Sequence, residues 1–210
     1  MRPRCWFHVP RCAGAISLVL SALGPSRAHA QRADSTKTAP LVVYRIVPSS
    51  SCPREPDPDC AEKVRRKRIY GDDVTGLIDD RREESIVARL TMLLGALDRA
   101  HPADAWSRYL SDGKPDWTRI AVSGLSQGAG MAAYIAQRTT VARVILFSSP
   151  WDNYGRLQTL APWVRRGHGA TPAERWYAAY HRNENTADVI ARAYAALQIP
   201  MLGDVRLPKQ

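Results

Sequence analysis

The chain has 210 residues, which is enough for one α/β domain with a hydrophobic core and short for two. Hydrophobic residues make up 45% and charged residues 24%, a balance that excludes a disordered protein. The formal net charge is +10, but the first 30 residues hold four arginines and no acid, so the remainder carries only +6. Beyond those residues, no apolar stretch is long enough to span a bilayer.

Residues 1–30 have the features of a secretory signal peptide. Three arginines precede a short apolar run at 12–24, and Ala28-His29-Ala30 places small residues where a signal peptidase reads them. A short membrane anchor and a buried N-terminal helix are the alternatives, but the run is too short for a comfortable span. We therefore expect cleavage near Ala30 and a secreted or periplasmic protein without a stable membrane anchor. Residues 31–40 are polar and predict a tether.

Export determines how the cysteines are interpreted. Cys5 and Cys12 leave with the signal peptide, so Cys52 and Cys60 remain, in CPREPDPDC. An even count in an oxidising compartment favours a disulfide that closes this small loop. Zinc is the alternative, but two thiols without nearby histidines make a poor metal site. We expect no metal and no organic cofactor.

The domain proper is expected at 41–210. Residues 41–47 (LVVYRIV) are β-branched and predict a buried strand. Residues 52–80 are polar and rich in proline and charge, which predicts a surface insertion or lid. The basic run at 63–68 (KVRRKR) is a candidate for binding nucleic acid, an anionic membrane or an acidic substrate. It lacks interleaved aromatic residues, so a solvated loop is favoured and no nucleic-acid partner is expected.

Further along the chain, strands and helices alternate. Apolar residues spaced three and four apart predict helices at 83–100 and 188–197, and a third follows at 131–138. Short runs of apolar residues predict strands at 119–123, 141–147 and 176–180. This order predicts an α/β fold with a mostly parallel sheet flanked by helices.

The sharpest motif is Gly124-Leu125-Ser126-Gln127-Gly128, a G-x-S-x-G sequence between a predicted strand and a predicted helix. Small residues beside the serine permit a tight, strained turn that lifts the hydroxyl above the carboxyl end of the strand. The N–H of Gln127 then lies at a helix N-terminus, where it can donate to an oxyanion. The alternative is a glycine-rich turn of another α/β protein. The context favours Ser126 as a nucleophile.

Residues 117–152 resemble the α/β-hydrolase superfamily of serine esterases and lipases, and are most similar to a poorly characterised secreted bacterial branch. The elbow of that branch usually reads G-H-S-Q-G-x-G, with Leu125 here in place of the histidine, and the next strand ends in a Ser/Gly-Pro-x-Asp turn. The resemblance implies an α/β-hydrolase-like fold and a catalytic order of serine, acid, histidine. Asp152 and Glu184 fit the two usual places of the acid, and the segment around Glu184 is the more similar to the family's acid-bearing loop.

The expected histidine has no clear counterpart. The superfamily places it after a further strand, and no histidine follows His181 before the chain stops at Gln210, so the resemblance implies a C-terminally shortened relative. The leading hypothesis is an exported serine hydrolase that cleaves small-molecule esters through an acyl-enzyme on Ser126. The alternative is a degenerate hydrolase fold that binds a ligand or partner without catalysis. The sequence does not indicate an oligomeric state.

Overall fold

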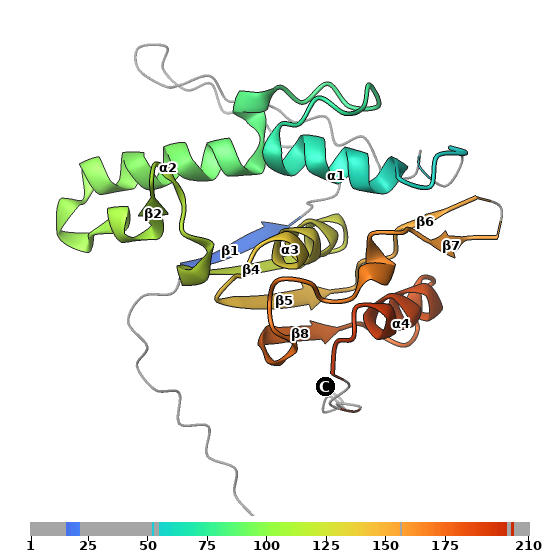
Figure 1. Ribbon diagram of the computed structural model, residues 1–210. Helices are drawn as coiled ribbons and strands as arrows, with labels where there is room; N and C mark the ends of the chain where they lie inside the picture. Colours follow the sequence, from blue (N-terminus) through green and yellow to red (C-terminus); the bar gives the residue numbers. More distant parts are fainter. Residues whose placement is uncertain (1–15, 22–51, 53–54, 156, 201–202, 204–210) are drawn as a thin grey trace, which may run out of the picture.

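The computed structural model describes residues 16–21, 52, 55–155, 157–200 and 203. A four-stranded parallel sheet in the order β1-β4-β5-β8 lies at its centre (Figure 1). The strands of this sheet are β1 (Ile16–Ser21), β4 (Ile120–Leu125), β5 (Arg143–Phe147) and β8 (Trp176–Ala179). The chain is therefore an α/β protein with a parallel sheet, as the sequence predicts.

Helices connect and cover the strands. They are α1 (Cys60–Tyr70), α2 (Ile86–Ala100), α3 (Gln127–Arg138) and α4 (Ala187–Ala196). Two small antiparallel pairs are formed by β2 (Leu110–Ser111) with β3 (Lys114–Pro115), and by β6 (Asn153–Tyr154) with β7 (Thr159–Leu160). Short 3₁₀ turns occupy Arg82–Glu84, Pro102–Asp104, Trp106–Tyr109, Trp117–Arg119, Val164–Arg166 and Ala173–Arg175.

The unit that positions the motif is β4-α3-β5. Helix α3 packs on β4, β5 and β1, and ten of its twelve residues are buried because small side chains allow close approach to the sheet. Alternate residues of the strands face this helix layer, including Val122, Val144 and Leu146, all fully buried. The helix begins at Gln127, four residues before the predicted start, because the turn leads into it directly.

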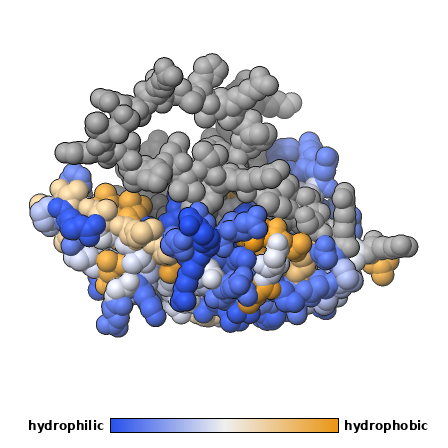
Figure 2. Space-filling view, turned by 90° about the horizontal axis from the view of Figure 1, so that it is seen from above, coloured by the Kyte–Doolittle hydropathy of each residue, from blue (hydrophilic) through white to orange (hydrophobic). Residues whose placement is uncertain are grey.

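The opposite face of the same sheet is more open. Leu125 and Phe147 are paired in register and are 48% and 44% exposed, and Tyr177 of β8 is 39% exposed. Successive side chains of a strand point to opposite faces of the sheet, so one face packs against α3 and the other is partly exposed. Seen from above, the described surface is mostly hydrophilic, and hydrophobic side chains emerge in separate places (Figure 2).

Strand β1 comes from residues that the sequence assigns to a signal peptide. It pairs with β4 from Ile16 opposite Ile120 to Ser21 opposite Leu125. A short apolar run satisfies the pattern of a buried parallel strand as well as that of a signal peptide, since both require consecutive apolar residues. Cleavage near Ala30 stays a prediction. The strand predicted at 41–47 and the tether at 31–40 lie outside the described residues.

Part of the predicted surface insertion at 52–80 belongs to the hydrophobic core. Its helix α1 contributes Ala61, Val64 and Ile69 to this core. The basic run lies in this helix rather than in a loop, and four of its five charges have local acidic partners. These ion pairs join Lys63 to Asp57, Arg66 to Asp72, Lys67 to Asp73 and Arg68 to Asp80. Among the described residues, no helix is long and apolar enough to cross a membrane.

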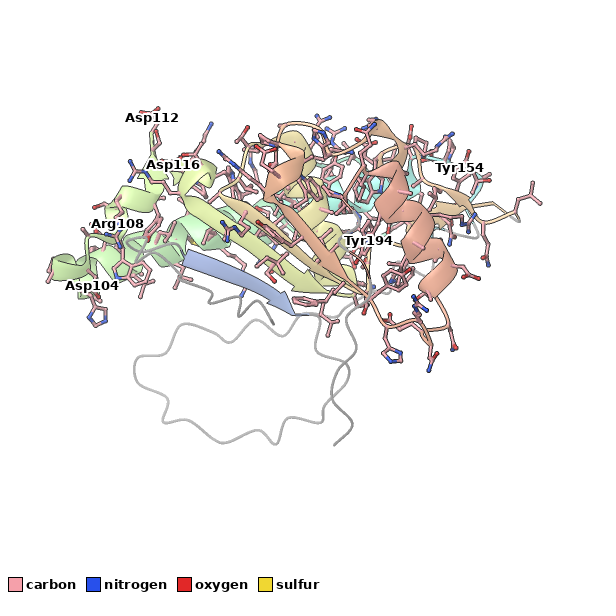
Figure 3. All side chains as sticks on the ribbon, turned by 90° about the horizontal axis from the view of Figure 1, so that it is seen from below. Asp104, Arg108, Asp112, Asp116, Tyr154 and Tyr194 are labelled. Carbon is pink, nitrogen blue, oxygen red and sulfur yellow. A yellow bond between two sulfur atoms is a disulfide. The ribbon has the colours of Figure 1, made fainter. Side chains whose placement is uncertain are left out.

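The parallel strands begin at one end of the molecule and finish at the other, and the side at which they finish is called the carboxyl edge of the sheet. Figure 3 shows Tyr194 of α4 near the end toward which the strands point, while Asp104, Arg108 and Asp116 lie at the other end. The predicted helices at 83–100 and 188–197 correspond to α2 and α4 within a few residues. The motif lies at the carboxyl edge, because its first two residues, Gly124 and Leu125, are the last two of β4.

Candidate active site

Ser126 occupies the single residue between the end of β4 and the start of α3. Its backbone has φ 54° and ψ −121°, a conformation that L-residues rarely adopt. Such strain costs on the order of 1–3 kcal/mol and persists only where the surrounding structure enforces it. The Ser126 N–H donates to the carbonyl of Phe147 at 2.9 Å, and the Ser126 carbonyl accepts from Gly130 N–H at 3.3 Å. The turn is thus fixed on both sides, and the half-buried hydroxyl lies at its apex.

Gly124 of the motif and Gly130 just after it each lie where a side chain would not fit. A Cβ on Gly124 would overlap the backbone of Gly128 and Ala129, so the first turn of α3 can lie this close to β4 only if residue 124 lacks a side chain. A Cβ on Gly130 would overlap the guanidinium of Arg65 on α1. The first glycine therefore permits the turn, and the second permits α1 to pack behind it.

The N-terminus of α3 points at the same edge. Gln127 is the first residue of this helix, and amides of the first helical turn lie along the axis toward the strand end. A helix of 12 residues adds the positive end of its dipole there. A negative oxygen that develops beside Ser126 would therefore meet the N–H of Gln127.

A carboxylate and a second serine follow the next two strands. Ser148, directly after β5, has φ 55°, and its N–H donates to the carbonyl of Ala179 at the end of β8 at 3.0 Å. The Ser148 hydroxyl donates to Oε1 of Glu184 at 2.7 Å, and the N–H of His181 donates to the same oxygen at 2.6 Å. Glu184 is half-buried. Its two hydrogen bonds hold the carboxylate at the edge of the sheet where Ser126 lies.

Asp152 has a different environment. Both of its carboxylate oxygens accept from Arg65 at 2.6 Å, and Oδ2 also accepts from the indole N–H of Trp163 at 2.8 Å. The side chains of Arg65 and Asp152 are 4% and 3% exposed. The guanidinium also lies over the Trp163 ring, 5.2 Å from its centroid. The carboxylate is thus engaged in joining α1 to the segment after β5.

None of the three histidines of the described part has a hydrogen bond to Ser126. His168 contacts Thr171, which bonds to Ala136 and Val141 near the end of α3 distant from Ser126. His101 follows α2 and is exposed. His181 lies at the same edge of the sheet as Ser126, but its ring is exposed and its Nδ1 accepts from Asn183 N–H at 3.2 Å. Its ring is not the group that contacts Glu184, since that contact is made by its backbone.

A small cavity adjoins the motif. It measures about 10 Å³ and is lined by Arg65, Arg68, Asp152, Gln127 and Met131 together with apolar residues of α1. This is the size of a site for one water molecule. In the described residues, no three histidine, cysteine, aspartate or glutamate side chains gather as a metal site would require.

The predicted disulfide is confirmed. Cys52 and Cys60 are bonded, with Cα atoms 5.5 Å apart, and both are buried. The bond fixes the N-terminus of α1, because Cys60 is its first residue. Arg65, which pairs with Asp152, lies on the next turn of this helix.

Comparison of the chain with models of protein families, with curated proteins and with solved structures finds no match. The site therefore has to be interpreted from its own geometry. Of the predicted residues, the structure brings Ser126, Gln127 and Glu184 to one edge, whereas Asp152, which shares a cavity with Gln127, is bonded to Arg65 and Trp163. Sequence reasoning missed Ser148 and Arg65. Ser148 had one available signal, because a polar residue directly after a parallel strand lies at the edge where ligands bind.

Proposed function

We propose that this protein is a serine hydrolase of the α/β-hydrolase type, which cleaves carboxylic esters through an acyl-enzyme on Ser126. The observation that carries the proposal is the backbone of Ser126, with its positive φ between β4 and α3. A nucleophile elbow needs that conformation at that place. A glycine-rich turn without a catalytic role has no need of a strained serine at its apex.

The geometry supports a division of roles. The Ser126 hydroxyl attacks the ester carbonyl, and the Gln127 N–H with the α3 dipole stabilises the oxyanion. Glu184 is the carboxylate of the site, because its Oε1 is held by two donors at the strand edge where Ser126 lies. Asp152 is assigned a structural role, since Arg65 and Trp163 take up its oxygens inside the protein.

The test is covalent labelling of the purified full-length chain with a fluorophosphonate, followed by peptide mapping. We expect an adduct on Ser126 that is absent in Ser126→Ala and in heat-denatured protein. Ser111→Ala, which changes an exposed serine of β2, is the matched control and should label like wild type. Folded wild-type protein that gives no Ser126 adduct would refute the hydrolase proposal.

The second candidate function is ligand binding by a hydrolase-like fold that does not catalyse a reaction. It is favoured by one observation, that no histidine in the described residues is hydrogen-bonded to Ser126 or, through its ring, to Glu184. Absence of labelling would select it. An exported location and a small-molecule ester substrate belong to the leading proposal. Each can be checked directly, by the N-terminus of the mature protein and by a series of chromogenic esters.

A further inference from the structure

Resting on the proposed function, we propose that Ser148 and Glu184 together accept the proton of Ser126, in the place where a serine hydrolase usually has a histidine. Ser148 is then a catalytic residue that relays the proton, and Glu184 is the general base. Neither role follows from the motif, because Ser148 follows β5 and Glu184 lies in the loop after β8, whereas Ser126 follows β4.

The first support is the contact between the two groups. The Ser148 hydroxyl donates to Oε1 of Glu184 at 2.7 Å, a length typical of a hydroxyl bonded to a carboxylate. The N–H of His181 donates to the same oxygen at 2.6 Å and fixes the carboxylate independently of Ser148. The pair therefore has the arrangement of a hydroxyl activated by a base.

The second support is the position of this pair relative to Ser126. Leu125 and Phe147 are partners in register on neighbouring parallel strands, which lie about 4.8 Å apart. Ser126 and Ser148 are the next residue of each strand, and the Ser126 N–H donates to the Phe147 carbonyl at 2.9 Å. The backbones of the two serines are thus neighbours at the carboxyl end of the sheet, and a water between their hydroxyl groups would complete the relay.

The third support is the backbone of Ser148. It has φ 55°, almost the same as Ser126 at 54°, and its N–H donates to the carbonyl of Ala179. Two non-glycine residues with positive φ thus end adjacent strands, and each donates to the last carbonyl of the following strand. Conformations of this kind cost energy and gather at functional sites. Here they place Ser126 and Ser148 at the ends of neighbouring strands, with Glu184 bonded to the Ser148 hydroxyl.

The proton balance of the step is complete. As the Ser126 oxygen forms its bond to the ester carbon, its proton passes to the Ser148 oxygen, and the Ser148 proton passes to Glu184. The carbonyl π electrons move to the oxyanion beside the Gln127 N–H. When the tetrahedral intermediate collapses, the alcohol leaves with the proton returned from Glu184 through Ser148. Water repeats the sequence on the acyl-enzyme, so no co-reactant beyond ester and water is needed.

The rival bases are less well placed. The Asp152 carboxylate is enclosed by Arg65 and Trp163, and His168 lies toward the other edge of the sheet. His181 is on the correct edge, but its ring faces Asn183 rather than the carboxylate. The Ser148–Glu184 pair is thus the base that the described residues offer to Ser126.

The experiment measures the second-order rate of fluorophosphonate labelling at Ser126 in the full-length chain. Loss of a general base slows such chemistry about 10²- to 10⁴-fold, so we expect slowing in that range for both Ser148→Ala and Glu184→Gln. The double variant should be no slower than the slower single one, because both groups act in one relay. Glu184→Gln keeps an acceptor for Ser148 and His181, so it tests the base in a folded protein, as circular dichroism will verify.

The decisive control removes every histidine. The chain has five, at positions 8, 29, 101, 168 and 181, and a variant with glutamine at all five should label within about threefold of wild type. Labelling lost in that folded variant, or Glu184→Gln and Ser148→Ala labelling at the wild-type rate, would overturn the relay while leaving Ser126 a nucleophile. Wild-type protein without a Ser126 adduct would overturn the relay and the hydrolase proposal together.

Discussion

Breaking the buried ion pair between Arg65 and Asp152 from one side should destabilise the fold strongly. Replacing Asp152 with alanine leaves the guanidinium of Arg65, 4% exposed, without its two hydrogen bonds to carboxylate oxygens. Breaking a buried pair from one side costs about 3–5 kcal/mol. Domains of this size are stable by about 5–15 kcal/mol, so Asp152→Ala should remove a large fraction of the free energy of unfolding.

The measurement is urea denaturation followed by circular dichroism, with Asp72→Ala as the matched control. Asp72 pairs with Arg66 on the same helix, but those side chains are 37% and 41% exposed, so its loss should cost less than about 1 kcal/mol. Equal, small losses in the two variants would show that the Asp152 pair is not buried as described. In the folded fraction, Asp152→Ala should label at Ser126 at the wild-type rate. A hundredfold slower rate would instead make Asp152 the catalytic acid.

Three further outcomes are expected. Replacing both cysteines of the disulfide with alanine should lower the free energy of unfolding by about 2–3 kcal/mol, the loop-closure entropy of nine residues, measured by urea denaturation. Burial opposes ionisation of Glu62, but hydrogen bonds from Arg166 and Tyr134 outweigh it and hold its pKa below the usual 4.5. Stability from Glu62 is therefore present above pH 4.5 and lost as the pH falls through the folded pKa, so Glu62→Gln should flatten the acid limb of a stability–pH curve. Gly124→Ala should cost about 1–3 kcal/mol and abolish Ser126 labelling, because its Cβ overlaps Gly128; normal labelling would contradict the described turn.

The elements around the motif were predictable because their signals are local. The apolar run that became β4 and the small residues that became α3 lie next to each other in the chain, and the turn between them has its own sequence pattern. Their parallel arrangement then followed from alternating strands and helices. The cysteine pair was predictable for the same reason, since only eight positions separate its members.

Contacts between distant segments were not predictable in this way. Arg65 and Asp152 are 87 positions apart, and the ion pair between them neutralises the one charge of the basic run that is buried. Read locally, that run has the composition of a solvated loop. Ser148 and Glu184 are 36 positions apart, so their contact required the register of β5 against β8. The local pattern placed each residue on an element but could not assign its partner.

The choice between the two candidate acids depends on this long-range pairing. Each follows a neighbouring strand of the sheet, and sequence position alone fits both to a triad. A carboxylate with both oxygens bonded to an arginine stabilises the fold, and its further use in catalysis would require that pair to break at a cost of several kcal/mol. Glu184 has one oxygen bonded to Ser148 and His181, and its contacts lie at the strand edge. The energetics therefore favour Glu184 for chemistry.

Helix α1 connects these observations. Gly124 allows the elbow itself, whereas Gly130 leaves room for the guanidinium of Arg65, which reaches past α3 to Asp152. Gly130, the third glycine of the extended motif, and Asp152 are thus joined through Arg65 of a helix whose first residue is tethered by the disulfide. A lid, as predicted for residues 52–80, would open without disturbing the turn at Ser126. This helix instead packs against α3, which begins directly after Ser126, so it belongs to the support of the turn rather than to a movable cover.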